Sequence, residues 1–541
     1  MSSIIPTLSL SFSLLISFVF SKNPLICPQP KNKTIVSIFF FIKIRFPRSE
    51  KRIFSSFLVT PMWFDINRFH LLVLLTWQFS IFFASQQIFP IFSNYVPQWK
   101  CGDSEPTSDC DVYQTCKANL TFVNVAFKSA AMEYDWICGK SAYLKSLFSQ
   151  IQFAGVLCGT FSFGAVSDVV GRKPVAVFAL SLGILMNFVT GLAPNYQLLL
   201  GIRFFLGLSV GGTLVVVCTF VMEMLLPKQR MALRAFFNWG VARLMMTLIA
   251  MALPEWRISS IACAIAALPA LIIIIFVFPE SPTWLHNKGR LDEMKKSEKH
   301  IAKMAGVSYV PIEHQKIEHS KTVMEMLQTK GLMRRLFVLW SMWFVASICG
   351  YATDLNSNTI SGDLFVNQIL FSILIAVSKM ILVIFDTHVP SFRRRTLHQG
   401  AQLVVCICFL ILTFMTFYGY TGLAFLIVNL IGTVFIEYTW DACYLCAVES
   451  METACRASAT GTCSLVARIG AILAPMLNYA NLWWPPSVYL TVVLLGTINL
   501  IISYFFLVET KNVNLDNVHI DPSSEEGTPM IDEKPSQKSD Q

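Results

Sequence analysis

The stretch GAVSDVVGRKP, residues 164–174, places charged side chains between two long apolar runs. Asp168 supplies a carboxylate, and Arg172 and Lys173 supply two adjacent cations. Each neighbouring run is long enough to cross a membrane as a helix, because about 20 apolar residues span ~30 Å of hydrocarbon. The stretch is therefore typical of a short loop between two membrane helices.

The whole chain has the composition of an integral membrane protein. Of its 541 residues, 54% are hydrophobic and 14% are charged, which is too apolar for a soluble protein whose surface is wetted by charge. Twelve apolar runs of spanning length follow residue 65. They cover residues 70–91, 142–166, 174–194, 196–222, 235–254, 257–279, 335–353, 363–386, 399–418, 421–447, 460–482 and 486–508. We therefore predict an all-α membrane protein with twelve transmembrane helices and both termini on one side.

Lysine and arginine residues indicate which side is cytoplasmic, because basic loops remain in the cytosol. Between Thr283 and Arg335 there are eleven Lys or Arg residues against six Asp or Glu residues. The loop from Phe92 to Ser141 has four Lys against six acidic residues, and it also contains four cysteines and a glycosylation sequon. Such a loop is typical of an extracellular, disulfide-bonded segment. The candidates are Cys101, Cys110, Cys116 and Cys138 for two disulfides, with three possible pairings, and Asn119 for the glycan.

The predicted spans divide the chain into five parts. Residues 1–61 are interpreted as a non-essential extension, with Met62 as an alternative start. The polar residues 512–541, which are rich in Pro and Ser, are predicted to form a disordered cytoplasmic tail. The other three parts are a first six-helix half at 62–282 with its extracellular loop at 92–141, a cytoplasmic linker at 283–334, and a second six-helix half at 335–511.

Acidic residues at the cytoplasmic ends of the spans recur half a chain apart. The pairs, with their offsets in residues, are Asp168 and Asp386 (218), Glu223 and Glu449 (226), and Glu280 and Glu509 (229). Basic residues follow these acids, namely Arg172, Lys173 and Arg394 after the first pair and Arg230 and Arg456 after the second. Three pairs in order at nearly constant offset predict two halves of the same topology. We expect these charges to cap helix ends and to bridge halves that rock, although each charge could also simply orient its helix.

The quoted stretch resembles the loop motif of the major facilitator superfamily, in which Gly164 and Gly171 permit a tight turn and close helix approach. PESPTWL at residues 279–285 resembles the PESPRWL signature of sugar porters and organic ion transporters, with Thr283 in place of Arg. The cysteine-bearing loop that ends in EYDWICGK, GDLFVNQILF at 362–371 and YLCAVESMETACRASATGTCSLVARIGAILAP at 444–475 favour the second group. From Phe64 to Lys511 the chain is therefore similar to solute carrier family twenty-two, closest to its anion or carnitine-type branches. The resemblance implies the major facilitator fold and alternating access.

One arginine, Arg468, lies inside the predicted eleventh span, where an uncompensated guanidinium costs at least ~2.5 kcal/mol. In the family that this chain resembles, arginine at this position is typical of anion and carnitine-type carriers, and aspartate is typical of cation carriers. Lys379 in the eighth span falls where anion carriers have a lysine. Two cations near the bilayer midplane would attract a carboxylate or sulfate group of a substrate.

A structural role for these cations is the alternative. Glu437 and Asp441 lie four residues apart on one face of the tenth span and could neutralise Arg468, or Arg243 in the fifth span, or could themselves attract a cation. Lys379 could instead extend towards the cytosol. The candidate aromatic walls of the substrate site, by resemblance to the family, are Tyr351, Trp440 and Tyr444.

These features predict a plasma-membrane transporter of small organic ions, with organic anions favoured. The alternatives are a transporter of organic cations or zwitterions, a sugar porter, and a non-transporting relative, which Thr283 and Glu452 would suit because both depart from the family pattern. An enzyme is not expected, since the sequence has no P-loop, no catalytic-triad spacing and no metal cluster, and no cofactor or metal is predicted. The expected partners are a small organic ion and the lipid bilayer. The net charge of +9 reflects basic cytoplasmic loops and not nucleic-acid binding.

Overall fold

The structure is a computed structural model that describes residues 67–116, 119–224, 238–311, 323–389, 392–451 and 453–510. Residues Arg68–Gln541 form one unit of the chain. The predicted N-terminal extension, Arg230, Glu452, the tail at 512–541 and part of the linker lie outside the described residues.

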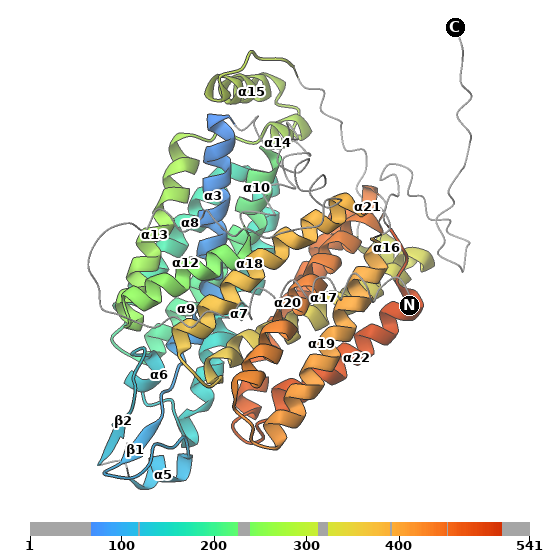
Figure 1. Ribbon diagram of the computed structural model, residues 1–541. Coiled ribbons are helices and arrows are strands. Elements are labelled where there is room, and N and C mark those ends of the chain that lie inside the picture. The colour runs from blue at the N-terminus through green and yellow to red at the C-terminus, as the bar shows by residue number, and fades with distance from the viewer. Residues whose placement is uncertain are drawn as a thin grey trace, which may run out of the picture. The chain divides into compact units, whose positions relative to one another are not determined.

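Membrane-spanning helices make up most of this unit (Figure 1). The first half contains α3 (Arg68–Ala84) with η2 (Ser85–Ile88) and α4 (Pro90–Ser93), then α7 (Tyr143–Val170), α8 (Arg172–Thr190), α9 (Tyr196–Gly212) with η4 (Thr213–Val217) and α10 (Cys218–Glu223), α12 (Trp239–Ala252) and α13 (Trp256–Phe276). The second half contains α17 (Lys330–Asn356) with η5 (Ser357–Thr359), α18 (Leu364–His388), α19 (Arg394–Phe417), α20 (Leu423–Glu449), α21 (Thr453–Ala480) and α22 (Ser487–Phe506).

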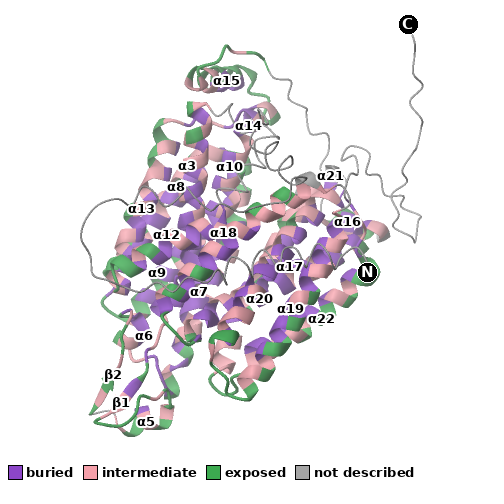
Figure 2. Cartoon of the chain, in the orientation of Figure 1, coloured by how far each residue is buried: buried purple, intermediate pink, exposed green. Residues whose placement is uncertain are grey.

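The length and composition of these helices confirm the predicted twelve-helix architecture. Eleven of them are long and apolar enough to cross a membrane. The remaining one, α12, has 14 described residues and follows residues 225–237, which the structure does not describe. Large apolar side chains are exposed along the helices, for example Phe161 at 69% and Phe276 at 79%. Figure 2 marks the exposed positions along the helices in green. Such surfaces are suited to contact with lipid tails.

Helix packing repeats between the halves in the way that the offsets predict. In the first half α7 packs on α9, α8 on α9 and α13, and α3 on α12 and α13. The equivalent second-half pairs are α18 with α20, α19 with α20 and α22, and α17 with α21 and α22. The halves meet where α7 packs against α21 and where α12 packs against α18. These two contacts are equivalent, because the repeat places α7 and α18, and also α12 and α21, at the same positions in their halves. This symmetric interface is the expected architecture for a transporter whose halves rock against each other.

The loop at 92–141, which is predicted to be extracellular, has a small core of its own. Strands β1 (Trp99–Cys101) and β2 (Leu120–Phe122) pair antiparallel, and short helices α5 (Cys110–Thr115), α6 (Ala130–Glu133) and η3 (Gly139–Ser141) complete it. The predicted disulfides form, and of the three possible pairings the structure has Cys101–Cys116 and Cys110–Cys138. Trp99 packs edge-on against Tyr113 at 5.1 Å between ring centroids. Two disulfides compensate for an apolar core too small to hold such a loop by itself.

The described part of the linker is helical. It contains α14 (Pro282–Asn287), α15 (Leu291–Ala305) and α16 (Val323–Gln328). Ser281 caps α14, because its side chain accepts a hydrogen bond from the backbone N–H of Trp284 at 3.2 Å. The Trp284 indole donates to the carbonyl of Asp168 at 3.2 Å. The linker is thereby fixed to the cytoplasmic end of α7.

Candidate substrate and gating sites

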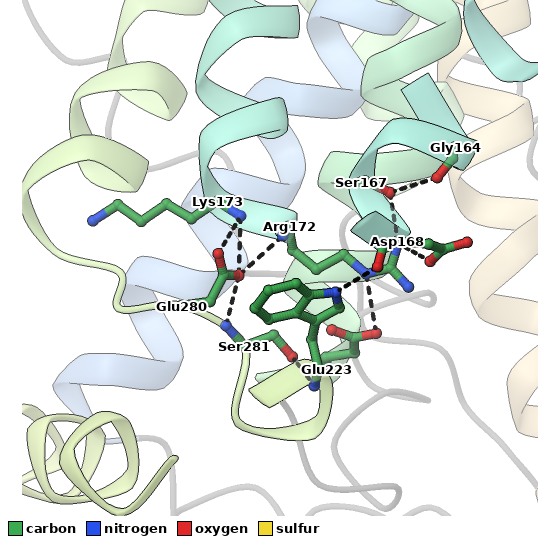
Figure 3. Close-up of polar contacts among 9 residues, drawn as sticks. Gly164, Ser167, Asp168, Arg172, Lys173, Glu223, Glu280 and Ser281 are labelled. Atoms are coloured by element: carbon green, nitrogen blue, oxygen red, sulfur yellow. Dashed lines mark hydrogen bonds and ion pairs between the residues drawn. The ribbon is translucent and has the colours of Figure 1, made fainter. Parts of the chain in front are cut away.

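The first charge cluster, on the side predicted to be cytoplasmic, surrounds Arg172 at the start of α8 (Figure 3). The Arg172 Nη1 atom lies 2.8 Å from Asp168 Oδ1, and its Nε atom lies 3.7 Å from Glu223 Oε1. Glu280 Oε1 accepts hydrogen bonds from the backbone N–H groups of Arg172 and Lys173 at 3.1 and 3.0 Å. A carboxylate there satisfies donors that a helix N-terminus leaves unpaired. The cluster connects the cytoplasmic ends of α7, α8 and α10 to the segment after α13.

Gly171 is the glycine of the motif that the geometry requires. Its φ of 127° and ψ of 157° fall in a region that is essentially restricted to glycine. A Cβ atom at Gly171 would lie 2.6 Å from Glu280 Oε2. At Gly164, inside α7, an added Cβ would meet only Val215 Cγ1 at an ordinary 3.5 Å. The tight turn and close approach expected from the motif are therefore found at Gly171.

The second cytoplasmic cluster reproduces the first around Arg394. Its Nη1 atom lies 2.5 Å from Asp386 Oδ1, and its Nη2 atom lies 3.1 Å from Glu449 Oε1. The backbone N–H groups of Arg394 and Arg395 donate to Glu509 at 2.9 and 3.2 Å. Each half therefore has one arginine between two carboxylates, with a third carboxylate capping the helix that this arginine begins.

The structure pairs Glu449 with a different cation from the one that sequence spacing suggests. Arg456 follows Glu449 by seven residues, but Arg394 makes the ion pair with Glu449. Arg456 instead donates to the carbonyl oxygen of Met451 at 3.4 Å. Because α19 packs along α20, Arg394 reaches the carboxylate from a neighbouring helix.

Lys379 lies between the two acids of the tenth span. Its Nζ atom is 2.9 Å from Glu437 Oε2 and 2.8 Å from Asp441 Oδ2. The side chains of Lys379, Glu437 and Asp441 are 12%, 14% and 26% exposed. The described ion pairs of Glu437 and Asp441 are therefore with Lys379 of the second half, a partner that was not predicted for them from the sequence.

Arg468 lies at the middle of α21, the helix that packs against α7 of the other half. It is half-buried, its Nε atom has no hydrogen-bond partner, and no carboxylate of the described residues lies within 4 Å of it. Its neighbour is the Tyr351 hydroxyl, which donates to Gln87 Oε1 of the first half at 2.8 Å. The guanidinium therefore stands at the interface between the halves with donors available for an anion.

The three candidate aromatic residues divide between two places. Trp440 and Tyr444 pack with Trp343, whose ring centroid lies 5.8 Å from that of Trp440 and 4.4 Å from that of Tyr444. Tyr351 packs on Phe153 of α7 at 4.8 Å and so contacts the first half. Tyr351 also lies beside Arg468.

The comparisons with known proteins identify the family. The model for "Sugar (and other) transporter" matches residues 113–521, which is most of the chain. This chain belongs to the sugar (and other) transporter family. A Caenorhabditis elegans protein described as uncharacterized is 37% identical over 86% of this chain and 96% of its own length. Solute carrier family 22 member 15 of Xenopus tropicalis is 28% identical over 65% of this chain and 67% of its own length.

Solved structures show the same fold. The xylose transporter of E. coli in an inward open conformation has a TM-score of 0.58 and 14% identity, covering 82% of this chain and 98% of that one. Together with the relatives named as solute carrier family 22 members, this confirms the predicted resemblance and the major facilitator fold. The chain is a membrane transporter and not an enzyme.

Several hydrogen bonds between the halves of this transporter lie on the side that is predicted to be extracellular, and Asn238 of the first half also donates to the carbonyl of Ala376 of the second at 3.3 Å. Ser146 donates to the carbonyl of Pro475 at 2.7 Å, and Gln150 donates to that of Ile472 at 3.3 Å. Asn358 donates to the carbonyl of Ile91 at 3.0 Å. The two cytoplasmic clusters, by contrast, form their described ion pairs within their own halves. Ser146, Gln150 and Asn358 thus join the halves on the side predicted to be extracellular, as expected for an inward-facing arrangement.

One ion pair of this transporter was not predicted from the sequence. Arg243 of α12 binds Asp354 of α17, with 2.5 Å between Nη1 and Oδ1, and donates to Gln368 Oε1 of α18 at 2.7 Å. The sequence signal was available, since Asp354 directly follows the predicted seventh span at 335–353 and is the one acid of α17. Its partner, 111 residues away, becomes visible only in the fold.

Proposed function

We propose that this transporter moves small organic ions across the membrane by alternating access, with organic anions bound through Arg468. The observation that carries the proposal is the available guanidinium at the interface between the halves, without a carboxylate among its described neighbours. A planar fork of donors binds a carboxylate or sulfate in two places at once and so orients it. Tyr351, packed on Phe153, supplies an aromatic wall beside it.

Lys379 contributes less to anion recognition in this proposal. Two carboxylates already share its ammonium group, and an incoming anion would compete with both. Glu437 and Asp441 together carry more charge than the lysine they bind. This surplus favours a second candidate function, the transport of zwitterions or organic cations whose cationic end approaches Asp441. An organic cation transporter protein of Drosophila melanogaster and an organic cation/carnitine transporter of Arabidopsis thaliana are among the similar proteins.

Uptake measurements test the proposal. Cells expressing the full chain would receive a panel of labelled organic anions, organic cations and carnitine-like zwitterions, at equal cell-surface expression. We expect anion uptake, and we expect Arg468→Asp to reduce it by at least about tenfold, because a bidentate charged contact is worth about 1.5–3 kcal/mol. Arg290→Asp is the matched control, since Arg290 is exposed at the N-cap of α15, where it pairs with its neighbour Glu293 and lies over the ring of Trp284.

Two outcomes would contradict the proposal. Cation uptake that survives Arg468→Asp would favour the second candidate and direct attention to Asp441. A panel with no uptake by a chain present at the cell surface would favour a non-transporting relative. Loss of uptake in both Arg468→Asp and Arg290→Asp would indicate a general effect of the charge reversal.

We further propose that the chain resides in the plasma membrane with both termini in the cytosol. The disulfide-bonded loop supports an extracellular assignment, and Asn119 is exposed in it. Glycosylation at Asn119 would place that loop outside the cell. A glycosidase should increase the electrophoretic mobility of the wild-type chain and leave Asn119→Gln unchanged.

A further inference from the structure

A buried ion pair joins the two halves of the transporter. Arg243, which is 1% exposed, belongs to the first half, and Asp354, which is 13% exposed, belongs to the second. Of the ion pairs between residues that the structure describes, it is the one that crosses between the halves. Arg243 also lies over the ring of Phe371 at 5.3 Å. The Arg243–Asp354 pair is therefore a desolvated contact between two bodies that must move.

This pair lies on the side of the membrane that is closed. Asp354 is two residues from the end of α17, and Asn358, just beyond it, donates to the carbonyl of Ile91 in the first half. Alternating access requires the extracellular contacts to separate when that side opens. The pair must then break, which removes the arginine from Asp354.

An Asp354 carboxylate without Arg243 would have an unfavourable environment. The described charged or titratable groups that face this region are Arg243 of α12, Glu437 of α20, Tyr351 of α17, Arg468 of α21 beside Tyr351, and Tyr489 of α22, which bonds Asn356. Once Arg243 withdraws, the nearest charge left is the like charge of Glu437. Breaking a buried pair leaves an uncompensated charge, and a carboxylate relieves it by binding a proton.

We propose that Asp354 is a proton-coupling site. The carboxylate takes one proton from extracellular water when the halves open outward, and it releases that proton towards the cytosol when Arg243 returns. Transport is thereby coupled to inward proton movement. This inference rests on the proposed function, because it assigns the ion that accompanies the substrate.

The charges of the central residues fit this coupling. Three cations, Arg243, Lys379 and Arg468, and three acids, Asp354, Glu437 and Asp441, stand in neighbouring contacts. An organic anion bound at Arg468 adds one negative charge to this set. One proton on Asp354 offsets it, so that a monovalent anion and a proton cross together without net charge movement.

The test measures opening of the extracellular side and needs no transport substrate. Gln150→Cys places a thiol at the extracellular contact between α7 and α21, where Gln150 now bonds Ile472. A membrane-impermeant maleimide, added outside cells that express the full chain, labels this thiol when the halves separate. Labelling of the parent chain is subtracted. Labelling is also divided by that of Leu423→Cys, which is 70% exposed at the start of α20, to remove the effect of pH on thiol reactivity.

We expect labelling to rise roughly threefold or more as external pH falls from about 8.5 to about 5.5, because protonated Asp354 no longer holds Arg243. Asp354→Asn, which imitates the protonated acid, should give high labelling at every pH. Arg243→Gln removes the same contact from the other side and should likewise give high labelling at every pH.

Arg257→Gln is the matched control, because the Arg257–Glu133 pair lies on the same side but within the first half. Burial raises the pKa of Glu133, but hydrogen bonds from Arg257 and Trp256 outweigh this and lower it below its usual 4.5. Stabilisation from a carboxylate with a lowered pKa is lost only as pH falls through that lower value. The Arg257–Glu133 pair therefore stays formed at every pH of the series and contributes nothing to the pH response. Because of this, labelling in Arg257→Gln should depend on pH as it does when Arg257 is present.

Three results would overturn the proposal. Labelling of Gln150→Cys with Arg243 and Asp354 unchanged that ignores pH would exclude a proton-linked opening, and this arm does not depend on the folding of the Asp354 or Arg243 variants. A pH response retained in Asp354→Asn would assign the proton to another group. Labelling that changes when potassium replaces external sodium, and not with pH, would assign the site to a sodium ion. Absence of uptake in the substrate panel would refute the proposed function and would leave these labelling results standing.

Discussion

The motif glycines offer the sharpest test of how the cytoplasmic cluster is built. Gly171→Ala places a Cβ atom 2.6 Å from Glu280 Oε2 and forces alanine into φ 127°, ψ 157°. Backbone strain in that region costs about 1–3 kcal/mol. Displacement of Glu280 from the backbone N–H groups of Arg172 and Lys173 costs about 1–3 kcal/mol more. We expect a total loss of about 2–6 kcal/mol of stability.

Gly164→Ala is the matched control within the same motif. Gly164 lies inside α7, and its added Cβ meets only Val215 Cγ1 at 3.5 Å. Alanine favours a helix by up to about 1 kcal/mol relative to glycine. The stability of the Gly164→Ala variant should therefore equal or slightly exceed that of the wild type.

Thermal denaturation of the detergent-purified transporter, followed by the fraction that remains monodisperse after heating, measures both variants. We expect a clearly lower apparent Tm for Gly171→Ala and an unchanged or higher one for Gly164→Ala. If both variants matched the wild type, the contact between Gly171 and Glu280 would have no energetic role. An equal loss in both would mean that the motif needs glycine for a reason other than this geometry.

Three further predictions concern the ion pairs and the loop. Arg394→Gln should destabilise the transporter by about 3 kcal/mol in the same assay, whereas Arg393→Gln, at an exposed neighbour, should cost less than about 1 kcal/mol. Lys379→Gln should cost about 3–5 kcal/mol because two carboxylates lose their shared cation, and unchanged stability with lost uptake would instead indicate a substrate contact. Cys110→Ser and Cys101→Ser should each lower loop stability by about 2–4 kcal/mol. Mass spectrometry of unreduced peptides should find Cys110 joined to Cys138, and a different linkage would contradict the structure.

The repeated charges show how far sequence spacing can predict this structure. Constant offsets between Asp168 and Asp386, and between Glu280 and Glu509, correctly placed equivalent residues at equivalent helix ends, because both halves have the same topology. The eighth-to-ninth turn departs from a tight motif in sequence, yet Arg394 still reaches Asp386. Side-chain reach accommodates a change in turn length as long as the helix ends stay neighbours.

Spacing could not predict the partners of the unrepeated charges. Successive residues on a helix point about 100° apart, so neither the rotation of a helix nor its neighbours follow from offsets. Lys379 could have faced the cytosol, and Glu437 could have faced Arg468. The packing of α18 on α20 decides that Lys379 and Glu437 meet.

The charges that are repeated in both halves and the central charges that are not repeated have different roles in this transporter. Both cytoplasmic clusters use the same residue types in the same arrangement, because both halves must close and open the same side. The central charges have no such duplication. Five of the six belong to the second half, and Arg243 alone comes from the first. Binding of a substrate or a proton to the second half can therefore affect the position of the first half mainly through the Arg243–Asp354 pair. This ion pair is the contact through which binding and opening can be coupled.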